Sequence, residues 1–205
     1  DTRILEARTA WAGACMSISH HIEAKQAVDP IVDLAVEKNH QSCLPLIYIV
    51  LGTHSYAISE DYETGFEYLK KALEISKTTN NLEQQWTANL YAGNFLAINC
   101  QFEKSLAYFK EALKISESRK NIVSISIIKS VMSFENFFWR GDFDSFYQLS
   151  KETLDESTAL SIRHKGSAAF SYGVACFGKG YFDLAEKHLL QAAEDLAKFN
   201  VFVYG

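Results

Sequence analysis

The chain has 205 residues, 48% of them hydrophobic, so it can bury a core and is not disordered throughout. Only 2 Pro and 10 Gly occur, too few for the turns of an all-β sandwich, which favours a helical protein. The net charge of −5 excludes a broad basic surface for nucleic acid or anionic lipid. The longest nearly continuous apolar run, residues 44–51, is far shorter than the roughly 20 residues of a membrane helix, so we expect a soluble protein.

The cysteines indicate the compartment of the protein, and the two ends of the sequence indicate that it is part of a longer chain. The four cysteines form no Cys-x-x-Cys pair, and no secretory signal precedes them, which predicts a reducing compartment, the cytoplasm. The sequence begins without Met and ends on the apolar segment 201–204. We therefore expect a fragment of a longer protein.

An aromatic residue recurs with a period of about forty. Tyr62, Phe102, Phe143 and Phe182 are separated by intervals of 40, 41 and 39 residues, and each follows a short polar turn. Apolar residues at spacings of three and four come after each of them, a pattern typical of an amphipathic helix. Repeats of this kind bury a core by packing on their neighbours.

In chain order, the period predicts five helical hairpins. Their helices lie near 3–20 and 24–38 in the repeat 1–40, 42–58 and 62–79 in 41–80, 82–99 and 102–118 in 81–120, 121–139 and 143–157 in 121–159, and 160–178 and 182–199 in 160–200. Pro30 interrupts the second helix and leaves its start open.

Small residues mark one position in the first helix of the repeats. Gly13, Gly93 and Gly173 are separated by two intervals of 80 residues, or two periods each. Glycine inside a helix costs about 1 kcal/mol, so its reuse at one position predicts helices too close together for a Cβ. Thr53, which follows Gly52, and Phe134 depart from this pattern.

Residues 51–73 and 102–113, the latter Phe-Glu-Lys-Ser-Leu-Ala-Tyr-Phe-Lys-Glu-Ala-Leu, resemble tetratricopeptide repeats. The family unit has about 34 residues, so the period here implies longer helices. Longer units are similar to those of bacterial peptide-pheromone receptors and of sensor arms in multidomain ATPase or cyclase signalling proteins. The resemblance implies an all-α, right-handed α-solenoid of about five hairpins, forming one array over residues 1–205.

The search for chemistry finds no convergent catalytic set, phosphate loop or dinucleotide fingerprint. The tripeptides 140–142 and 178–180 fall in predicted turns, and the adjacent His20 and His21 point about 100° apart on a helix. We expect no catalysis, cofactor or metal site.

The resemblance places a concave groove on the first helices of the hairpins. One position of the repeat gives a polar row, and the next helical turn gives an apolar floor with two aromatic neighbours: His54, Asn94 and Glu135, then Ile58, Ile98 and Trp139, with Phe138 and Phe177. Packed helices lie roughly 8–10 Å apart, so the row spans on the order of 20 Å, which suits an extended ligand better than one catalytic centre. The alternative is that these polar residues are hydrated or paired with neighbouring helices.

We therefore expect a regulatory interaction module of a larger signalling protein that holds a protein or peptide in the groove, with no direct contact to nucleic acid or membrane. A second hypothesis is a small-molecule sensor arm that controls an attached ATPase, cyclase or transcription-activator domain. A third is a spacer that self-associates through the apolar segment 201–204.

Overall fold

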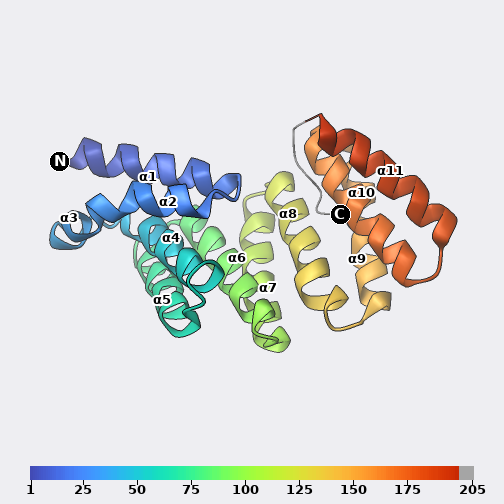
Figure 1. Cartoon of the computed structure of the whole chain (residues 1–205), viewed down its shortest axis with the longest axis horizontal. Coiled ribbons are helices and arrows are strands. Elements are labelled where there is room, and N and C mark those ends of the chain that lie inside the picture. The colour runs from blue at the N-terminus through green and yellow to red at the C-terminus, as the bar shows by residue number, and fades with distance from the viewer. Residues whose placement is uncertain (199–205) are drawn as a thin grey trace. The chain divides into compact units, whose positions relative to one another are not determined.

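The computed structural model describes residues 1–198, and these consist of helices and the turns between them (Figure 1). The α-helices are α1 (Thr2–Ser17), α2 (His21–Val28), α3 (Val32–Glu37), α4 (Leu44–Ala57), α5 (Tyr62–Thr78), α6 (Leu82–Ile98), α7 (Phe102–Ser118), α8 (Ile122–Met132), α9 (Phe143–Glu156), α10 (Ile162–Gly178) and α11 (Phe182–Ala197). Short turns of other helix types are η1 (Asp29–Ile31), η2 (Ser133–Phe138) and η3 (Ser157–Ala159). The all-α class and the helical hairpins expected from the period are confirmed. The segment 201–204 and the last residue of the helix predicted at 182–199 lie outside the described residues.

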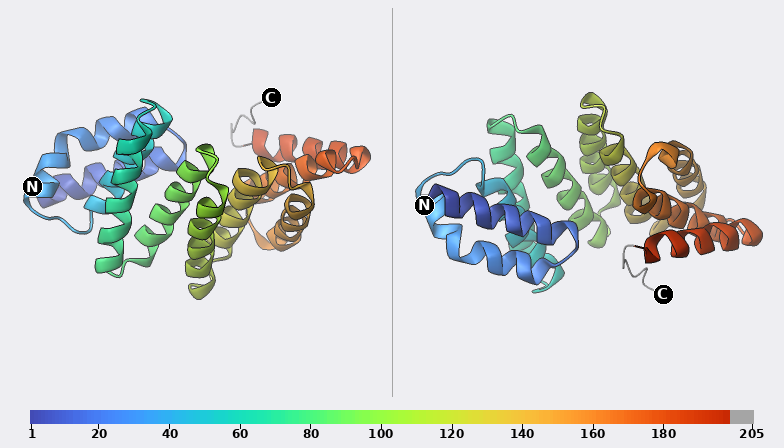
Figure 2. Two further views of the ribbon diagram at one scale, coloured as in Figure 1. Left: turned by 90° about the horizontal axis from the view of Figure 1, so that it is seen from below. Right: turned by 90° about the horizontal axis from the view of Figure 1, so that it is seen from above.

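The helices belong to two compact units, and each is described by itself. In the first unit, Asp1–Asn99, α1 packs on α2, α4 on α5, and α5 on α6. In the second, which begins at Cys100, α7 packs on α8, α8 and η2 on α9, and α10 on both α9 and α11 (Figure 2). Within residues 1–198, no helix combines the length and the apolar content needed to cross a membrane.

The bounds predicted for the second helix of the first repeat, 24–38, are wrong. It begins at His21 rather than near residue 24, and the turn η1 divides it into α2 and α3. Pro30 lies in that turn, where its missing backbone N–H cannot donate to the carbonyl four residues earlier. The effect of Pro30 is therefore to divide the helix in two, whereas the sequence indicated only that the start of the helix was open.

Helix ends are built in the same way along the chain. Residues with positive φ are spaced 20 or 21 residues apart from Ser19 to Gly141, and six of them are not glycine: Ser19, Asn39, Glu60, Asn80, Cys100 and Lys120. Each stands just past the end of a helix, and the N–H that follows Ser19, Asn39, Glu60, Asn80 and Lys120 donates to a carbonyl near the end of that helix. The next helices begin on Asp61, Asn81, Asn121 and Asp142, whose side chains accept a backbone N–H at 3.0–3.1 Å.

Two of the glycines lie where backbones approach closely. A Cβ on Gly173 would stand 2.8 Å from Cγ of Leu189 in α11, which confirms the close contact predicted for this position. In the second repeat, Gly52 takes this role one residue earlier than the period predicts, because its Cβ would lie 2.8 Å from the carbonyl oxygen of Gly65. The close contact between α4 and α5 is therefore made at Gly52, and the buried Thr53 beside it does not prevent it.

The first helix of the fourth repeat contains a π-helical turn. The sequence predicts one helix over 121–139, but α8 ends at Met132 and η2 continues it to Phe138 with wider turns. The segment from Asn121 to Phe143 is one residue longer than the equivalent segment from Asn81 to Phe102. A π turn accommodates one extra residue without shifting the helix ends, and such turns are frequent at functional sites.

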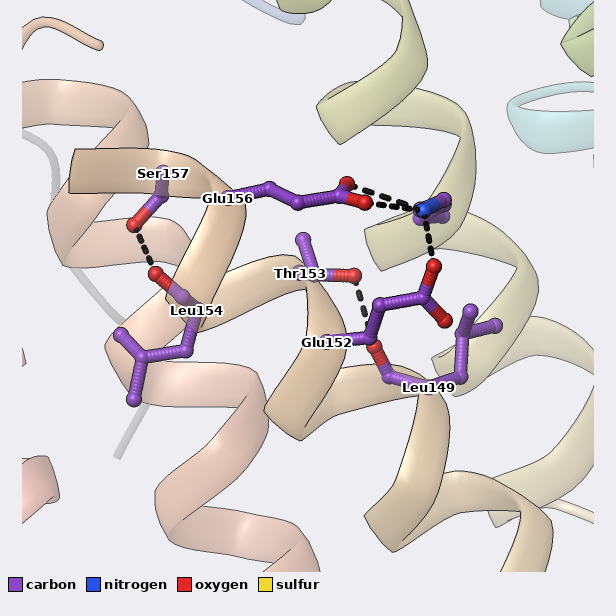
Figure 3. Close-up of polar contacts among 7 residues, drawn as sticks. Leu149, Glu152, Thr153, Leu154, Glu156 and Ser157 are labelled. Atoms are coloured by element: carbon purple, nitrogen blue, oxygen red, sulfur yellow. Dashed lines mark hydrogen bonds and ion pairs between the residues drawn. The ribbon is translucent and has the colours of Figure 1, made fainter. Parts of the chain in front are cut away.

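An ion-pair cluster ties α8 to α9. Lys129 is only 8% exposed, and its Nζ donates to Glu152 at 2.6 Å and to Glu156 at 2.9 Å (Figure 3). Burial alone would lower the pKa of Lys129, but the hydrogen bonds to the two glutamates outweigh it and raise the pKa above its usual value. The lysine therefore remains charged against α9.

Substitution of Glu60 by Gly should stabilise the first unit. Glycine removes the left-handed strain at this exposed residue, and we expect a gain of about 1 kcal/mol in the free energy of unfolding, measured by urea denaturation. Glu74→Gly is the matched control, because the same change in the middle of α5 should cost about 1 kcal/mol. Equal effects of the two changes would contradict this assignment.

Removing the two carboxylates should destabilise the second unit more than removing the lysine. The double change Glu152→Gln and Glu156→Gln leaves a buried ammonium group without a charged partner and should lower the free energy of unfolding by about 3 kcal/mol. Lys129→Met should change it by less than about 1 kcal/mol, since the half-exposed glutamates return to water. Chemical denaturation of both variants tests this order.

Candidate functional site

The predicted site residues divide between the two units. His54 and Ile58 lie at the end of α4, and Asn94 and Ile98 at the end of α6, all in the first unit. The remaining four, Glu135, Phe138, Trp139 and Phe177, lie in the second unit. Each group has its own geometry, and a continuous row across all the repeats stays a prediction.

In the first unit, aromatic packing between α4 and α6 sets the positions of the polar pair. The rings of Tyr56 and Phe95 meet edge to face with centroids 5.4 Å apart, and both are buried. His54 and Asn94 stand within one helical turn of these rings and are half-buried. Ile58 is 46% exposed, so the predicted apolar floor of this unit is accessible.

Histidine chemistry in this unit favours neutral rings. Burial lowers the pKa of His54, and the positive charge of Lys25 lowers it further against the opposing effect of Asp29. Burial likewise lowers the pKa of His21, with added repulsion from His54 and His20. At neutral pH, both imidazoles are uncharged and can donate through one nitrogen and accept through the other.

Asn94 carries an unused polar atom. Its Oδ1 is shielded from solvent and has no hydrogen-bond partner, and such an atom costs about 1–3 kcal/mol. Because this oxygen is shielded, a ligand can bond to it only when the side chain turns toward solvent.

In the second unit, five aromatic residues form what we call the aromatic patch: Phe138, Trp139, Phe143, Phe177 and Phe182. Phe138 contacts Trp139 and Phe143 with ring centroids 5.1 and 6.1 Å away, and Phe177 contacts Phe182 at 5.7 Å. Phe143 joins the two groups, because its ring covers Gly178 so closely that a Cβ there would lie 2.4 Å away. Trp139, Phe177 and Phe182 are each 63% exposed.

Paired charges surround the aromatic patch. Arg140 bonds to Glu103 at 3.0 Å, and Lys179 bonds to Asp144. Both pairs connect neighbouring elements of the second unit, so they hold the turns that carry the aromatic rings. An apolar centre with a polar rim is typical of protein-binding surfaces.

Glu135 lies in the π turn beside the aromatic patch. Burial raises the pKa of its carboxyl group, and a hydrogen bond donated by the Trp139 indole N–H opposes this effect. The neighbouring Asn136 is fully buried and donates from Nδ2 to the Phe102 carbonyl oxygen at 2.7 Å, which fixes the π turn to the start of α7. The Glu135 carboxyl group therefore orients the indole of Trp139, although burial disfavours its charged form.

Sequence reasoning predicted Phe138, Trp139 and Phe177 as binding residues but did not include the other members of the aromatic patch. Phe143 and Phe182 were recognised only as turn markers, yet their period already placed them next to the predicted floor. The buried Asn136 and Lys129 gave no signal, since isolated polar residues in apolar helices have many roles. Within the described residues, no three His, Cys, Asp or Glu side chains group so as to hold a metal.

The Glu135 carboxylate should make the second unit less stable as the pH rises. Its pKa is raised in the folded state, so its favourable contribution is complete at pH values below the unfolded pKa and is lost as the pH rises through the folded pKa. Glu135→Gln should therefore stabilise the protein at about pH 7 and have little effect at about pH 4, measured by thermal unfolding at both values. A pH-independent effect would contradict the burial argument.

Comparisons with known proteins relate the fold to solved repeat structures. No family model matches the sequence, and no curated protein matches it either. BtubC (BKLC) from P. vanneervenii superimposes with a TM-score of 0.67 at 14% identity, covering 100% of this chain and 91% of that chain. A putative kinesin light chain from Podospora anserina with nearly identical TPR-like repeats has a TM-score of 0.67 at 12% identity, with 97% of each chain covered.

A third solved structure contains a signalling domain. It is a signal transduction ATPase with numerous domains from Pyrococcus horikoshii that has a tetratricopeptide repeat sensor, with a TM-score of 0.69 at 16% identity over 95% of this chain and 30% of that chain. At these identities the likeness concerns the fold. The chain has the fold of a tetratricopeptide-like helical repeat protein.

Proposed function

We propose that this protein binds another protein or an extended peptide, with the aromatic patch of the second unit as the main contact. The observation that carries the proposal is the exposure of Trp139, Phe177 and Phe182, each at 63%. Large aromatic rings that remain in water at one connected surface mark interaction sites, because burying them on a partner releases free energy that folding did not use. Tryptophan is also enriched among residues that dominate binding energy.

The construction of the patch supports a role in binding rather than in folding. Gly178 keeps space for the Phe143 ring, and the ion pairs of Arg140 and Lys179 hold the surrounding turns. The rings are therefore presented on fixed helix ends. A preorganised surface loses less conformational entropy when a partner binds.

The first unit carries a polar surface of its own. The neutral imidazole of His54 and the side-chain amide of the half-buried Asn94 can bond to backbone groups of an extended ligand, while Ile58 and Ile98 contact its apolar side chains. We propose that this binding serves a regulatory role in a larger cytoplasmic signalling protein. The tetratricopeptide repeat sensor of the Pyrococcus horikoshii ATPase supports this proposal by likeness of fold.

A second candidate is a small-molecule sensor arm for an attached ATPase, cyclase or transcription-activator domain. A cavity of about 450 Å³ lies among α9, α10 and α11, within the range usual for small-ligand sites. Lys165, Lys187 and His188 line it together with Asp155 and Asp195. Because the cavity shares no residue with the aromatic patch, substitutions in one should leave ligand binding by the other unchanged.

Loss of either exposed ring should weaken peptide binding. Short peptides selected from a random display library on the wild-type chain serve as probes, and their dissociation constants are measured by calorimetry. We expect Trp139→Ala and Phe177→Ala each to weaken binding at least about tenfold, because each removes an aromatic anchor.

Trp11→Ala is the matched control for this experiment. Trp11 has the same 63% exposure as Trp139 but lies on α1 in the other unit. It should leave the affinity of the selected peptides unchanged. Equal binding by the Trp139 and Phe177 variants, or equal loss in the Trp11 variant, would overturn the assignment of the patch.

A further inference from the structure

One buried position in the first helices of the repeats is occupied by a much smaller residue in the fifth repeat. The position recurs at intervals of 40 residues: Ile49, Asn89, Lys129 and Ala169. Ala169 is one of the residues that line the cavity of about 450 Å³ among α9, α10 and α11. The cavity therefore stands at a position where the preceding repeats place a larger side chain.

Two further residues of the cavity correspond to the glutamates of the ion-pair cluster in the fourth repeat. Gln191 follows Glu152 by 39 residues, and Asp195 follows Glu156 by the same interval, which also separates the aromatic residues at the start of α9 and α11. In the fourth repeat, the two glutamates converge on the Lys129 ammonium group (Figure 3). The fifth repeat thus keeps a carboxylate and an amide oxygen at these positions but has no lysine between them.

The cavity arises from this exchange of residues and not from the position of the fifth repeat in the chain. In the fourth repeat, which α10 and α11 follow, the hydrogen bonds of the cluster join only α8 to α9. The space there is filled by Lys129, a side chain of the repeat itself. In the fifth repeat, Leu154 and Asp155 border the cavity from α9, the helix that precedes it.

Asp195 provides a buried carboxylate with acceptor capacity to spare. It is 7% exposed and accepts from Nε2 of Gln191 at 3.1 Å and from Nζ of Lys198 at 3.2 Å. The Lys198 side chain is 56% exposed, and exposed ion pairs of this kind contribute little to stability. Because a carboxylate can accept about four hydrogen bonds, Asp195 can also bind a second ammonium group inside the cavity.

Lys187 and His188 provide hydrogen-bond donors about two helical turns before Asp195 on α11. Lys187 forms no ion pair with the part of the chain that the structure describes, residues 1–198. Burial and the charge of Lys187 lower the pKa of His188, so its ring is uncharged at neutral pH and can donate through one nitrogen. The remaining charged residues of the lining, Lys165 and Asp155, have opposite signs, so the cavity lining as a whole is balanced.

We infer that the cavity binds a small zwitterion, whose primary ammonium group bonds to Asp195 and Gln191 and whose carboxylate bonds to Lys187 and His188. This inference rests on the second candidate function, the small-molecule sensor, and gives it a class of ligand. The apolar stem of the ligand lies against Leu154 and Ala169.

The spacing of the donors and acceptors sets the length of the ligand. Asp195 and Lys187 are separated by eight residues of α11, or about 12 Å. A hydrogen bond of about 3 Å at each end leaves about 6 Å between the ammonium and carboxylate groups of the ligand. Two kinds of molecule have this separation. One is an ω-amino acid such as δ-aminovalerate, which has the stem and ammonium group of a lysine side chain, and the other is a dipeptide such as dialanine.

Titration of the whole chain, followed through the NMR signals of its backbone amides, tests the class of ligand with four probes. δ-Aminovalerate and dialanine carry both charges, pentylamine carries only the ammonium group, and valerate only the carboxylate. We expect at least one zwitterion to bind with a Kd on the order of 1 mM, and at least about tenfold more tightly than the two singly charged probes. Preference for δ-aminovalerate identifies an ω-amino acid as the ligand, and preference for dialanine a dipeptide. Binding of neither zwitterion, or equal binding of a singly charged probe, overturns the inference.

Substitutions test the assigned groups. Asp195→Asn and Lys187→Met should each weaken binding of the zwitterion at least about tenfold, because each removes one charged partner. Glu194→Gln and Lys151→Met are the matched controls, since these exposed residues of α11 and α9 lie outside the cavity lining. Equal losses in the controls, or full binding by both cavity variants, would show that the ligand binds elsewhere and overturn the inference.

Ala169→Lys restores the lysine of the fourth repeat and should abolish binding, because its ammonium group takes the place of the ligand beside Asp195. Thermal unfolding shows whether this variant is folded, and Asp195→Asn serves in its place if it is not. Retained binding by folded Ala169→Lys overturns the inference. If instead pentylamine or valerate binds as tightly as the zwitterions and Ala169→Lys abolishes that binding, the class of ligand is wrong while the small-molecule sensor stands. Peptide binding by the aromatic patch should be the same in all these variants.

Discussion

Burial of an apolar stripe between neighbouring helices is the interaction on which the rest of this structure depends. In α5, Leu69 and Ala72 are fully buried, while Lys70 and Lys71 on the same helix are exposed. Phe109 and Ala112 in α7 repeat the arrangement one period later. A single hairpin cannot cover its own stripes on both sides, so each helix is stable only with a neighbour.

Regular stacking also demands that helices end at equivalent places. Left-handed residues every 20 or 21 positions and side-chain caps on the following helices provide these ends. Where the fourth repeat has one residue more, the π turn η2 absorbs it while the helix ends keep their positions. The wider turn contains Glu135, whose partner Trp139 projects into solvent at the next turn of the chain. An irregularity required by packing thus lies beside one of the most exposed aromatic residues of the candidate site.

The two units differ in what they offer a partner. The aromatic patch presents apolar area in fixed positions, which suits burial against a partner, whereas the half-buried His54 and Asn94 are polar groups suited to directional hydrogen bonds. The cavity among α9, α10 and α11 has charged walls and suits a smaller ligand. Repeat proteins can hold such surfaces side by side because each repeat contacts only its neighbours, so one surface can change without disturbing another.

The sequence by itself determined the all-α hairpins, their period and most helix bounds, because caps, helical spacing and turn residues act over a few positions. It also predicted Trp139 and Phe177 as binding residues, since equivalent positions of a repeat share one face. Only the tertiary structure decided that Gly52 rather than position 53 makes the close contact, that η2 is a π turn, and that Lys129 is buried against two glutamates. It likewise brought the Phe143 ring against Gly178. These features arise from contacts between different helices, and the local periodicity of the sequence carries no information about which residues of two helices meet.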